Sequence, residues 1–209
     1  MFDTAIIVSS CDKYFNTWEP FAHCFNKYWK DCPYPLYFIT NHKDSPIGKT
    51  IRVGEDRGWA SNMIHALKQV PEPIIIVLLE DYFLSDYVDS PRIEDLVSLV
   101  RNGAGQVRLL PCAESKEGRI NEDALYIASL QPGIWNKEYF KTFLVPGDDA
   151  WAFELSSSRR YKGNGLNYST LEPALPIWNF DGREILIRGV WDKDIYKFTE
   201  KEGIEIKPL

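Results

Sequence analysis

The sequence lacks three features that would each identify a class of protein. No two of its four cysteines have the spacing of a zinc site, and its three histidines form no cluster with them. No apolar run reaches the length of a membrane-spanning helix. The N-terminus has neither the basic start nor the long apolar run of a signal peptide. We therefore expect a cytoplasmic protein whose thiols are reduced and lie in or near the core.

The chain also has fewer basic than acidic residues. The chain has 24 lysine and arginine residues against 30 aspartate and glutamate residues, a formal net charge of -6. Nucleic acid is therefore not an expected partner, because its phosphates require a basic surface. Aromatic residues make up 14% of the 209 residues, well above their share in disordered or coiled-coil chains. This length and composition predict one folded domain with a sizeable core.

Apolar periodicity predicts strands and helices along the whole chain. The expected strands are the apolar parts of 4–12, 32–41, 74–79, 105–112, 124–135 and 183–191. The expected helices are 14–29, 57–70, 89–100, 136–144 and one that begins at Asp148 or Asp149. We expect Ser90 and Asn136 to cap two of these helices, and 156–167 to form a loop or a mobile lid. The last dozen residues are charged and are expected to be frayed.

The order of these segments predicts an α/β fold. Strands and helices that alternate along a chain form mostly parallel, Rossmann-like sheets flanked by helices. The continuous apolar runs at 5–8 and 74–79 support this, because strands buried on both faces do not alternate. The later part mixes strands and short helices, and no linker divides the chain. We therefore expect a single domain, with one half at 1–110 and a mixed α/β half at 111–209.

Polar side chains follow two of the expected strands at the point where each ends. Ser9, Ser10 and Asp12 follow the first strand, and Glu80 and Asp81 follow the strand at 74–79. In open α/β sheets, ligands bind beyond the carboxyl ends of the strands. If the two strands are parallel, both groups lie at the same edge of the sheet. We therefore predict a ligand site there.

The adjacent carboxylates of Glu80 and Asp81 indicate a cation. Two such groups repel each other unless a positive charge lies beside them. Mg²⁺ or Mn²⁺ is held by one or two carboxylates together with substrate phosphates, so both residues are candidate metal ligands at a diphosphate. Successive side chains of a regular strand point to opposite faces, so we expect only one to face the ligand. The alternative is two solvated acids that begin a loop.

Four further segments occur in a fixed order and spacing. They are “IIVSSCDKY”, “RGWASNMIHAL”, “LLEDYFL”, and “YIASLQPGIWNKEYF” leading to “DDAWAFE”. Together they span most of the chain and resemble the GT-A class of nucleotide-sugar glycosyltransferases, especially small bacterial enzymes of surface-polysaccharide assembly. The resemblance implies a GT-A-like fold. It also implies transfer of a sugar from a nucleoside diphosphate donor to a hydroxyl of a saccharide or lipid-linked glycan acceptor.

The resemblance implies roles for individual residues as well. On the donor side, beside the nucleoside, ribose, diphosphate and metal, it places Ser9, Ser10, Asp12, Arg57, Ser61, Asn62, Glu80 and Asp81. In the sugar and acceptor cleft it places Gln131, Pro132 and Trp135. The general base that takes the proton of the acceptor hydroxyl would be one of Asp148, Asp149 and Glu154.

Helix spacing ranks these candidate bases. Glu154 lies one helical turn from Trp151, so both share a helix face, and a carboxylate beside an aromatic ring suits a sugar. Asp148 and Asp149 stand at the helix start, where the macrodipole alone favours acids. Capping and catalysis are therefore both open for them. We rank Glu154 first and Asp149 second, and Trp151 is a candidate for the acceptor side.

Two departures from the family pattern bear on the metal. Tyr82 stands where a full DxD motif has its second acid, and the three histidines all come early, where many members add a late histidine ligand. Divalent metal dependence is therefore an open expectation. Arg159, Arg160 or Arg188 could carry part of the diphosphate charge instead.

Two other functions stay open. A sugar nucleotidyltransferase uses a similar sheet, but it usually bears a glycine-rich, basic loop after the first strand, and “SSCDKYFNTWEP” contains no glycine. The incomplete acidic motif also fits a non-catalytic nucleotide-sugar or carbohydrate-binding module. Peripheral membrane contact and the oligomeric state are left open by the sequence.

Overall fold

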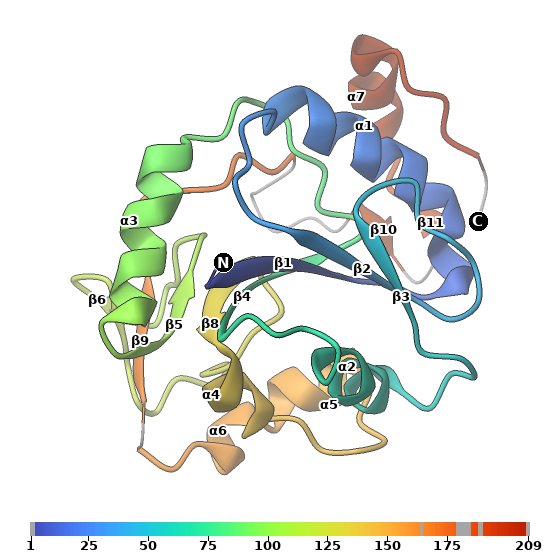
Figure 1. The fold of residues 1–209 in the computed structure, drawn as a ribbon. Coiled ribbons are helices and arrows are strands. Elements are labelled where there is room, and N and C mark those ends of the chain that lie inside the picture. Colours follow the sequence, from blue (N-terminus) through green and yellow to red (C-terminus); the bar gives the residue numbers. More distant parts are fainter. Residues whose placement is uncertain (1–2, 164, 179–184, 188–189, 208–209) are drawn as a thin grey trace.

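The computed structural model describes residues 3–163, 165–178, 185–187 and 190–207, and a nine-stranded sheet forms its centre (Figure 1). In spatial order, the strands are β3 (Lys49–Arg52), β2 (Leu36–Thr40), β1 (Thr4–Ser9), β4 (Ile74–Leu79), β8 (Gly133–Asn136), β5 (Ala104–Arg108), β9 (Leu166–Ser169), β7 (Arg119–Ile120) and β6 (Ser115–Lys116). A separate two-stranded sheet pairs β10 (Leu186–Ile187) with β11 (Val190–Trp191).

Most of the long strands in the sheet run in the same direction. β3, β2, β1 and β4 are parallel to one another, and β5 is parallel to β9. β8 is antiparallel to both of its neighbours, β4 and β5. The expected α/β class with a mostly parallel sheet is therefore confirmed, and strands from before and after residue 110 share that sheet.

Helices cover both faces of the sheet (Figure 1). They are the 3₁₀ helix η1 (Asp12–Thr17), α1 (Trp18–Tyr28), α2 (Trp59–Leu67), α3 (Ser90–Arg101), α4 (Lys137–Lys141), α5 (Ala150–Leu155), α6 (Ser157–Arg160) and α7 (Ile195–Glu202). Buried residues of α1, α3 and α7 belong to one core layer, and those of α2, α4 and α5 belong to the other. None of the helices in the described ranges is both long and apolar enough to span a membrane.

The side chains of β1 explain its unbroken apolar run. Ile6 and Val8 belong to the core layer that includes Phe21 of α1. Ala5 and Ile7 belong to the opposite layer. All four are fully buried, so this strand has no polar face, as expected for a strand covered by helices on both sides.

Side-chain caps fix where three of the helices begin. Asn136 accepts a hydrogen bond from the Tyr139 amide and caps α4, as predicted. Asp149 caps α5, which confirms the predicted start of that helix. The prediction that Ser90 caps α3 is wrong by one residue. Asp89 is the cap, because its carboxylate accepts a hydrogen bond from the Arg92 amide at 3.0 Å.

Other predictions from apolar patterning are also corrected. Of the expected strand at 124–135, only the end belongs to β8. The expected loop at 156–167 contains α6 and the first residues of β9. The segment 183–191 includes parts of the antiparallel β10–β11 pair instead of one strand, and Arg188 lies outside the described residues. The short strand β3 had no counterpart among the predictions.

The expectation of a frayed C-terminus is wrong for 198–202, which belong to helix α7, and 208–209 lie outside the described residues. Helix α7 is amphipathic and packs its apolar side, including Phe198, into the core layer of α1. Glu202 is buried and accepts hydrogen bonds from the Tyr28 hydroxyl at 2.7 Å and from Lys27 Nζ at 2.6 Å. Charge density along the sequence suggested exposure, but the buried carboxylate ties the two helices together.

Candidate active site

A cleft of about 1000 Å³ lies at the carboxyl ends of β1 and β4. Ser9 of β1 is the register partner of Leu79 of β4, so the residues that follow each strand emerge at the same edge. Clefts of this size hold ligands as large as cofactors. The predicted site residues that line it are Ser9, Ser10, Asn62, Glu80, Asp81, Gln131, Pro132, Asp149, Trp151 and Glu154.

Tryptophan side chains hold the two serines at the end of β1. The Trp59 indole donates a hydrogen bond to the Ser9 hydroxyl at 3.0 Å. The Trp18 indole donates one to the Ser10 hydroxyl at 2.7 Å. Each bond joins the strand end to the first residue of a helix, α2 or α1. The backbone at this end of the cleft is therefore fixed from both faces of the sheet.

Asp12 was expected beside the nucleoside, but it does not line the cleft. One of its carboxylate oxygens accepts a hydrogen bond from the Asn41 amide at 3.0 Å, and the other accepts one from the His42 amide at 3.0 Å. Its own amide donates to the Asn41 side chain. The carboxylate is therefore used to hold the loop after β2 against the end of β1.

Glu80 and Asp81 both line the cleft. The prediction that only one would do so assumed a regular strand, but β4 ends at Leu79 and the chain turns, with the Tyr82 amide bonded to the Leu79 carbonyl at 3.1 Å. Glu80 is only 8% exposed. Burial, and then the negative charge of Asp81, hold the pKa of the Glu80 carboxyl well above its usual range.

This acid pair fits a divalent cation that is completed by a ligand. Among the described residues, no group of three or more histidine, cysteine, aspartate or glutamate side chains is arranged to hold a metal. Two carboxylates plus phosphate oxygens and water are nevertheless a usual set for Mg²⁺.

The other side of the cleft carries the predicted base. One carboxylate oxygen of Glu154 accepts hydrogen bonds from the Ser129 hydroxyl at 2.7 Å and the Leu130 amide at 2.6 Å. Trp151, one turn earlier on α5, is 61% exposed and lines the same cleft. Asp149 also lines it, although its carboxylate caps the helix. Glu154 is therefore positioned by the segment before β8, and an open aromatic ring stands beside it.

Arg108 lines the cleft and was missed by the sequence analysis. It ends β5 and is only 4% exposed. Its guanidinium donates to the Cys112 sulfur at 3.2 Å and to the Tyr126 carbonyl. Burial lowers its pKa below the usual arginine value. A charged residue inside an otherwise buried strand was the signal in the sequence that could have identified it.

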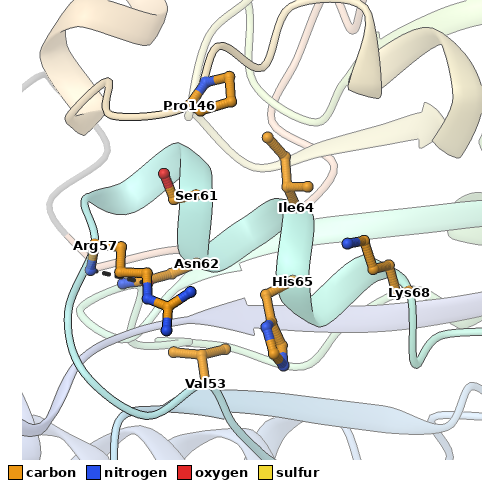
Figure 2. A pocket seen from close by; sticks show the side chains of 8 residues that line it. All are labelled: Val53, Arg57, Ser61, Asn62, Ile64, His65, Lys68 and Pro146. Carbon is orange, nitrogen blue, oxygen red and sulfur yellow. Dashed lines mark hydrogen bonds between the residues drawn. The ribbon is translucent and has the colours of Figure 1, made fainter.

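Arg57 lies outside this cleft, in a smaller pocket of about 270 Å³ along α2 (Figure 2). Its guanidinium and the His65 ring lie on the same side of the helix, toward Val53. Asn62 lines both cavities. It accepts a hydrogen bond from the Arg57 amide at 3.3 Å and donates one to Asp56 at 2.8 Å. Of these two predicted donor-side residues, only Asn62 reaches the larger cleft.

Trp135 was expected to shape the acceptor cleft, and this expectation is corrected. The residue belongs to β8 and is fully buried. Its ring packs edge-on against Phe140 and Phe143 on the face of the sheet that α4 covers. Gln131, which precedes the strand, is exposed and does line the cleft. Gln131 lies before β8 and Trp135 lies within it, so the two residues are separated although they are close in sequence.

No protein-family model matches the chain, and no curated protein matches it. Solved structures, in contrast, match the chain. TarS 1-349 from S. aureus superposes with a TM-score of 0.58 at 13% identity, over 83% of this chain and 59% of that chain. This chain spans 36% of a longer TarS structure. A protein assigned as a nucleotide-diphospho-sugar transferase from Desulfovibrio desulfuricans G20 superposes with a TM-score of 0.52 at 9% identity, over 81% of this chain and 80% of that chain.

CMP:2-keto-3-deoxy-manno-octonic acid synthetase, solved with CTP, gives a TM-score of 0.53 at 11% identity. The match covers 97% of this chain and 98% of that one. At such low identity these likenesses establish the fold only. The chain therefore has the fold of nucleotide-diphospho-sugar transferases, a large, mostly parallel sheet flanked by helices.

Proposed function

We propose that the chain is a glycosyltransferase that moves a sugar from a nucleoside diphosphate donor to a hydroxyl of a saccharide or lipid-linked glycan. The observation that carries this proposal is that one cleft combines the acid pair Glu80 and Asp81 with Glu154. The first two are suited to a diphosphate with its cation. Glu154 is suited to activating a hydroxyl.

In this proposal, the protein positions both substrates and moves one proton. The nucleoside lies at the end of β1, near Ser9 and Ser10, and the acceptor ring lies against Trp151. The acceptor oxygen forms a bond to the anomeric carbon, and the bond from that carbon to the diphosphate breaks. Glu154 takes the hydroxyl proton, and the nucleoside diphosphate leaves with the bonding electrons.

A divalent cation, Mn²⁺ or Mg²⁺, would supply charge neutralisation of the departing diphosphate when bound between the two carboxylates and the phosphates. Glu80 would have to be ionised to hold it. Donor binding should therefore release protons from the cleft, because burial and Asp81 raise the pKa of the Glu80 carboxyl.

The surrounding charges favour this reaction over nucleotidyl transfer. A nucleotidyltransferase must hold a nucleoside triphosphate. Among the described residues that line the cleft, Arg108 is the one lysine or arginine, and Asp56, Glu80, Asp81, Asp149 and Glu154 are all acidic. A polysaccharide or lipid-linked acceptor of bacterial surface assembly, with contact to a membrane surface, belongs to the same proposal.

Incubation of the chain with UDP-, GDP- and CMP-sugars and Mn²⁺ tests the proposal. We expect release of the sugar from a UDP- or GDP-sugar, and not from a CMP-sugar, which has no diphosphate, with loss of that activity in Glu80→Gln and Glu154→Gln. Glu138→Gln serves as a control, because this exposed carboxylate pairs with Lys141 on α4, outside the cleft. Synthesis of a nucleotide sugar from a nucleoside triphosphate, with no sugar release, would contradict the proposal. Nucleotide-sugar binding without turnover would assign a binding module instead.

A further inference from the structure

Arg108 is a buried cation whose charge Glu154 and Glu114 favour from a distance. It is 4% exposed, and none of the ion pairs among the described residues includes it. Its Nε–H has no hydrogen-bond partner. The two acceptors that it has are a sulfur and a carbonyl, and thioether or thiol sulfur is a weak acceptor.

Such an arrangement is costly for the protein alone. Guanidinium groups lose strong hydration on burial, and a buried charge is normally paired with an opposite charge and fully hydrogen-bonded. Arginine presents a planar set of donors that matches a carboxylate or a phosphate in two parallel hydrogen bonds. The cleft therefore contains an anion receptor with an unused donor, to which no carboxylate of the described residues is directly bonded.

The position of Arg108 places that anion on the acceptor side. Gly133 of β8 pairs with Val77 of β4 and with Arg108 of β5, so Arg108 lies two strands from β4 and level with Val77, three residues before Glu80. Arg108 bonds to the Tyr126 carbonyl, and Glu154 is held by Ser129 and Leu130 of the same segment. The guanidinium thus shares its support with the proposed base, while the acid pair follows β4, two strands away.

We propose that Arg108 binds a carboxylate or phosphate group on the acceptor, so that the acceptor is an anionic saccharide. The identification of the bound sugar as the acceptor rests on the proposed function. Binding of an anionic sugar at Arg108 stands independently of it. The anion neutralises the charge of the guanidinium, and the pair of hydrogen bonds orients the sugar so that one of its hydroxyls lies against Glu154.

Three sugars of similar shape test the inference. Glucose, glucuronic acid and glucose 6-phosphate are titrated calorimetrically into the wild-type chain, Arg108→Lys and Arg108→Met, without nucleotide. We expect one or both charged sugars to bind the wild type at least about tenfold more tightly than glucose. Arg108→Met abolishes that preference, and Arg108→Lys retains only part of it. Preference for glucuronic acid alone indicates a carboxylate, and preference for glucose 6-phosphate alone indicates a phosphate.

Thermal unfolding of the same variants separates recognition from a structural role. Because Arg108→Met removes a buried charge to which no carboxylate of the described residues is directly bonded, its Tm should equal or exceed that of the wild type. A lower Tm together with an unchanged preference for charged sugars would show that Arg108 only supports the Tyr126 segment, and would overturn the inference.

Two further results would also overturn it. One is the absence of any preference for charged over neutral sugar in the wild type. The other is weaker UDP binding in Arg108→Met with the sugar preference intact, which would assign Arg108 to the donor diphosphate. If the wild type binds no nucleoside diphosphate but prefers charged sugars through Arg108, the proposed function fails and the anionic sugar site stands.

Discussion

Ser9 and Leu79 are register partners in the parallel ladder between β1 and β4. The next residues along each strand, Ser10 and Glu80, therefore leave the sheet at the same edge and line the same cleft. This pairing brings residues from two distant parts of the sequence into one site. It also makes the electrostatics of Glu80 central to how the site behaves.

The raised pKa of Glu80 predicts that the protein loses stability as pH rises. Below about pH 4.3 the side chain is protonated in both the folded and unfolded states. Above it the unfolded chain ionises first, while burial and Asp81 keep the proton on the folded chain. The free energy of unfolding therefore falls until the pH passes the folded pKa. Glu80→Gln should remove this loss and be more stable than the wild type at neutral pH.

Urea unfolding of both chains between about pH 4 and about pH 8 measures this difference. The two stabilities should converge at the acidic end. Asp81→Asn should give an intermediate curve, because it removes the neighbouring charge and leaves the burial. A constant difference between Glu80→Gln and wild type across this range would show that Glu80 is not held neutral in the fold.

Two carboxylates on or beside α5 should differ in their contribution to turnover. Glu154→Gln keeps an oxygen for Ser129 and Leu130, so it should fold normally and lose about 10²–10⁴-fold in kcat. Asp149→Asn keeps the cap on α5 and should lose far less. Steady-state kinetics of donor consumption decide between them. Equal losses, or a larger loss in Asp149→Asn, would move the base to Asp149.

Replacement by alanine should lower stability at Trp135 and weaken acceptor binding at Trp151. Trp135→Ala removes a fully buried ring and should lower the free energy of unfolding by about 3–5 kcal/mol. Trp151→Ala removes a ring that is 61% exposed and should change it by less than about 0.5 kcal/mol. Denaturant unfolding gives both numbers. Only Trp151→Ala should raise the KM for acceptor, and unchanged kinetics there would remove Trp151 from the site.

Glu202 should link stability to pH at the acidic end. Burial opposes its charge, but hydrogen bonds from Lys27 and Tyr28 prevail and hold its pKa below the usual value. Its contribution is therefore present above the unfolded pKa and is lost as pH falls through the folded one. Glu202→Ala should cost about 1–3 kcal/mol near neutral pH, because Tyr28 is left without its acceptor. Glu205→Gln is the control, because Glu205 is exposed. A Glu202→Ala chain as stable as the control would contradict the role of Glu202.

The membership of β1 and β4 in a mostly parallel sheet could be predicted, because strands buried on both faces carry unbroken apolar runs. The position of β8 between β4 and β5 could not be predicted. Apolar patterning reports how deeply a segment is buried, and it does not name the partner strand. The same limit explains Trp135, whose apolar context fitted both the core and a cleft wall until the register of β8 was known.

Charged residues at strand ends were predicted unevenly for a similar reason. Glu80 and Asp81 stood out as a pair, whereas Arg108 stood alone in a segment that was recognised only as a strand. Asp12 had the right place in the sequence, but the loop after β2 folds back and its amides bind that carboxylate. Sequence position located the edge of the sheet, and long-range contacts decided which side chains reach the cleft.

Calorimetric titration of UDP, GDP and CMP, each with and without Mn²⁺, tests the central claim most directly. We predict that UDP or GDP binds the wild-type chain more tightly than CMP, and that its binding releases protons and weakens at least about tenfold in Glu80→Gln. Binding of none of the three, or equal binding by wild type and Glu80→Gln without proton release, would contradict a nucleotide site at the carboxyl ends of β1 and β4.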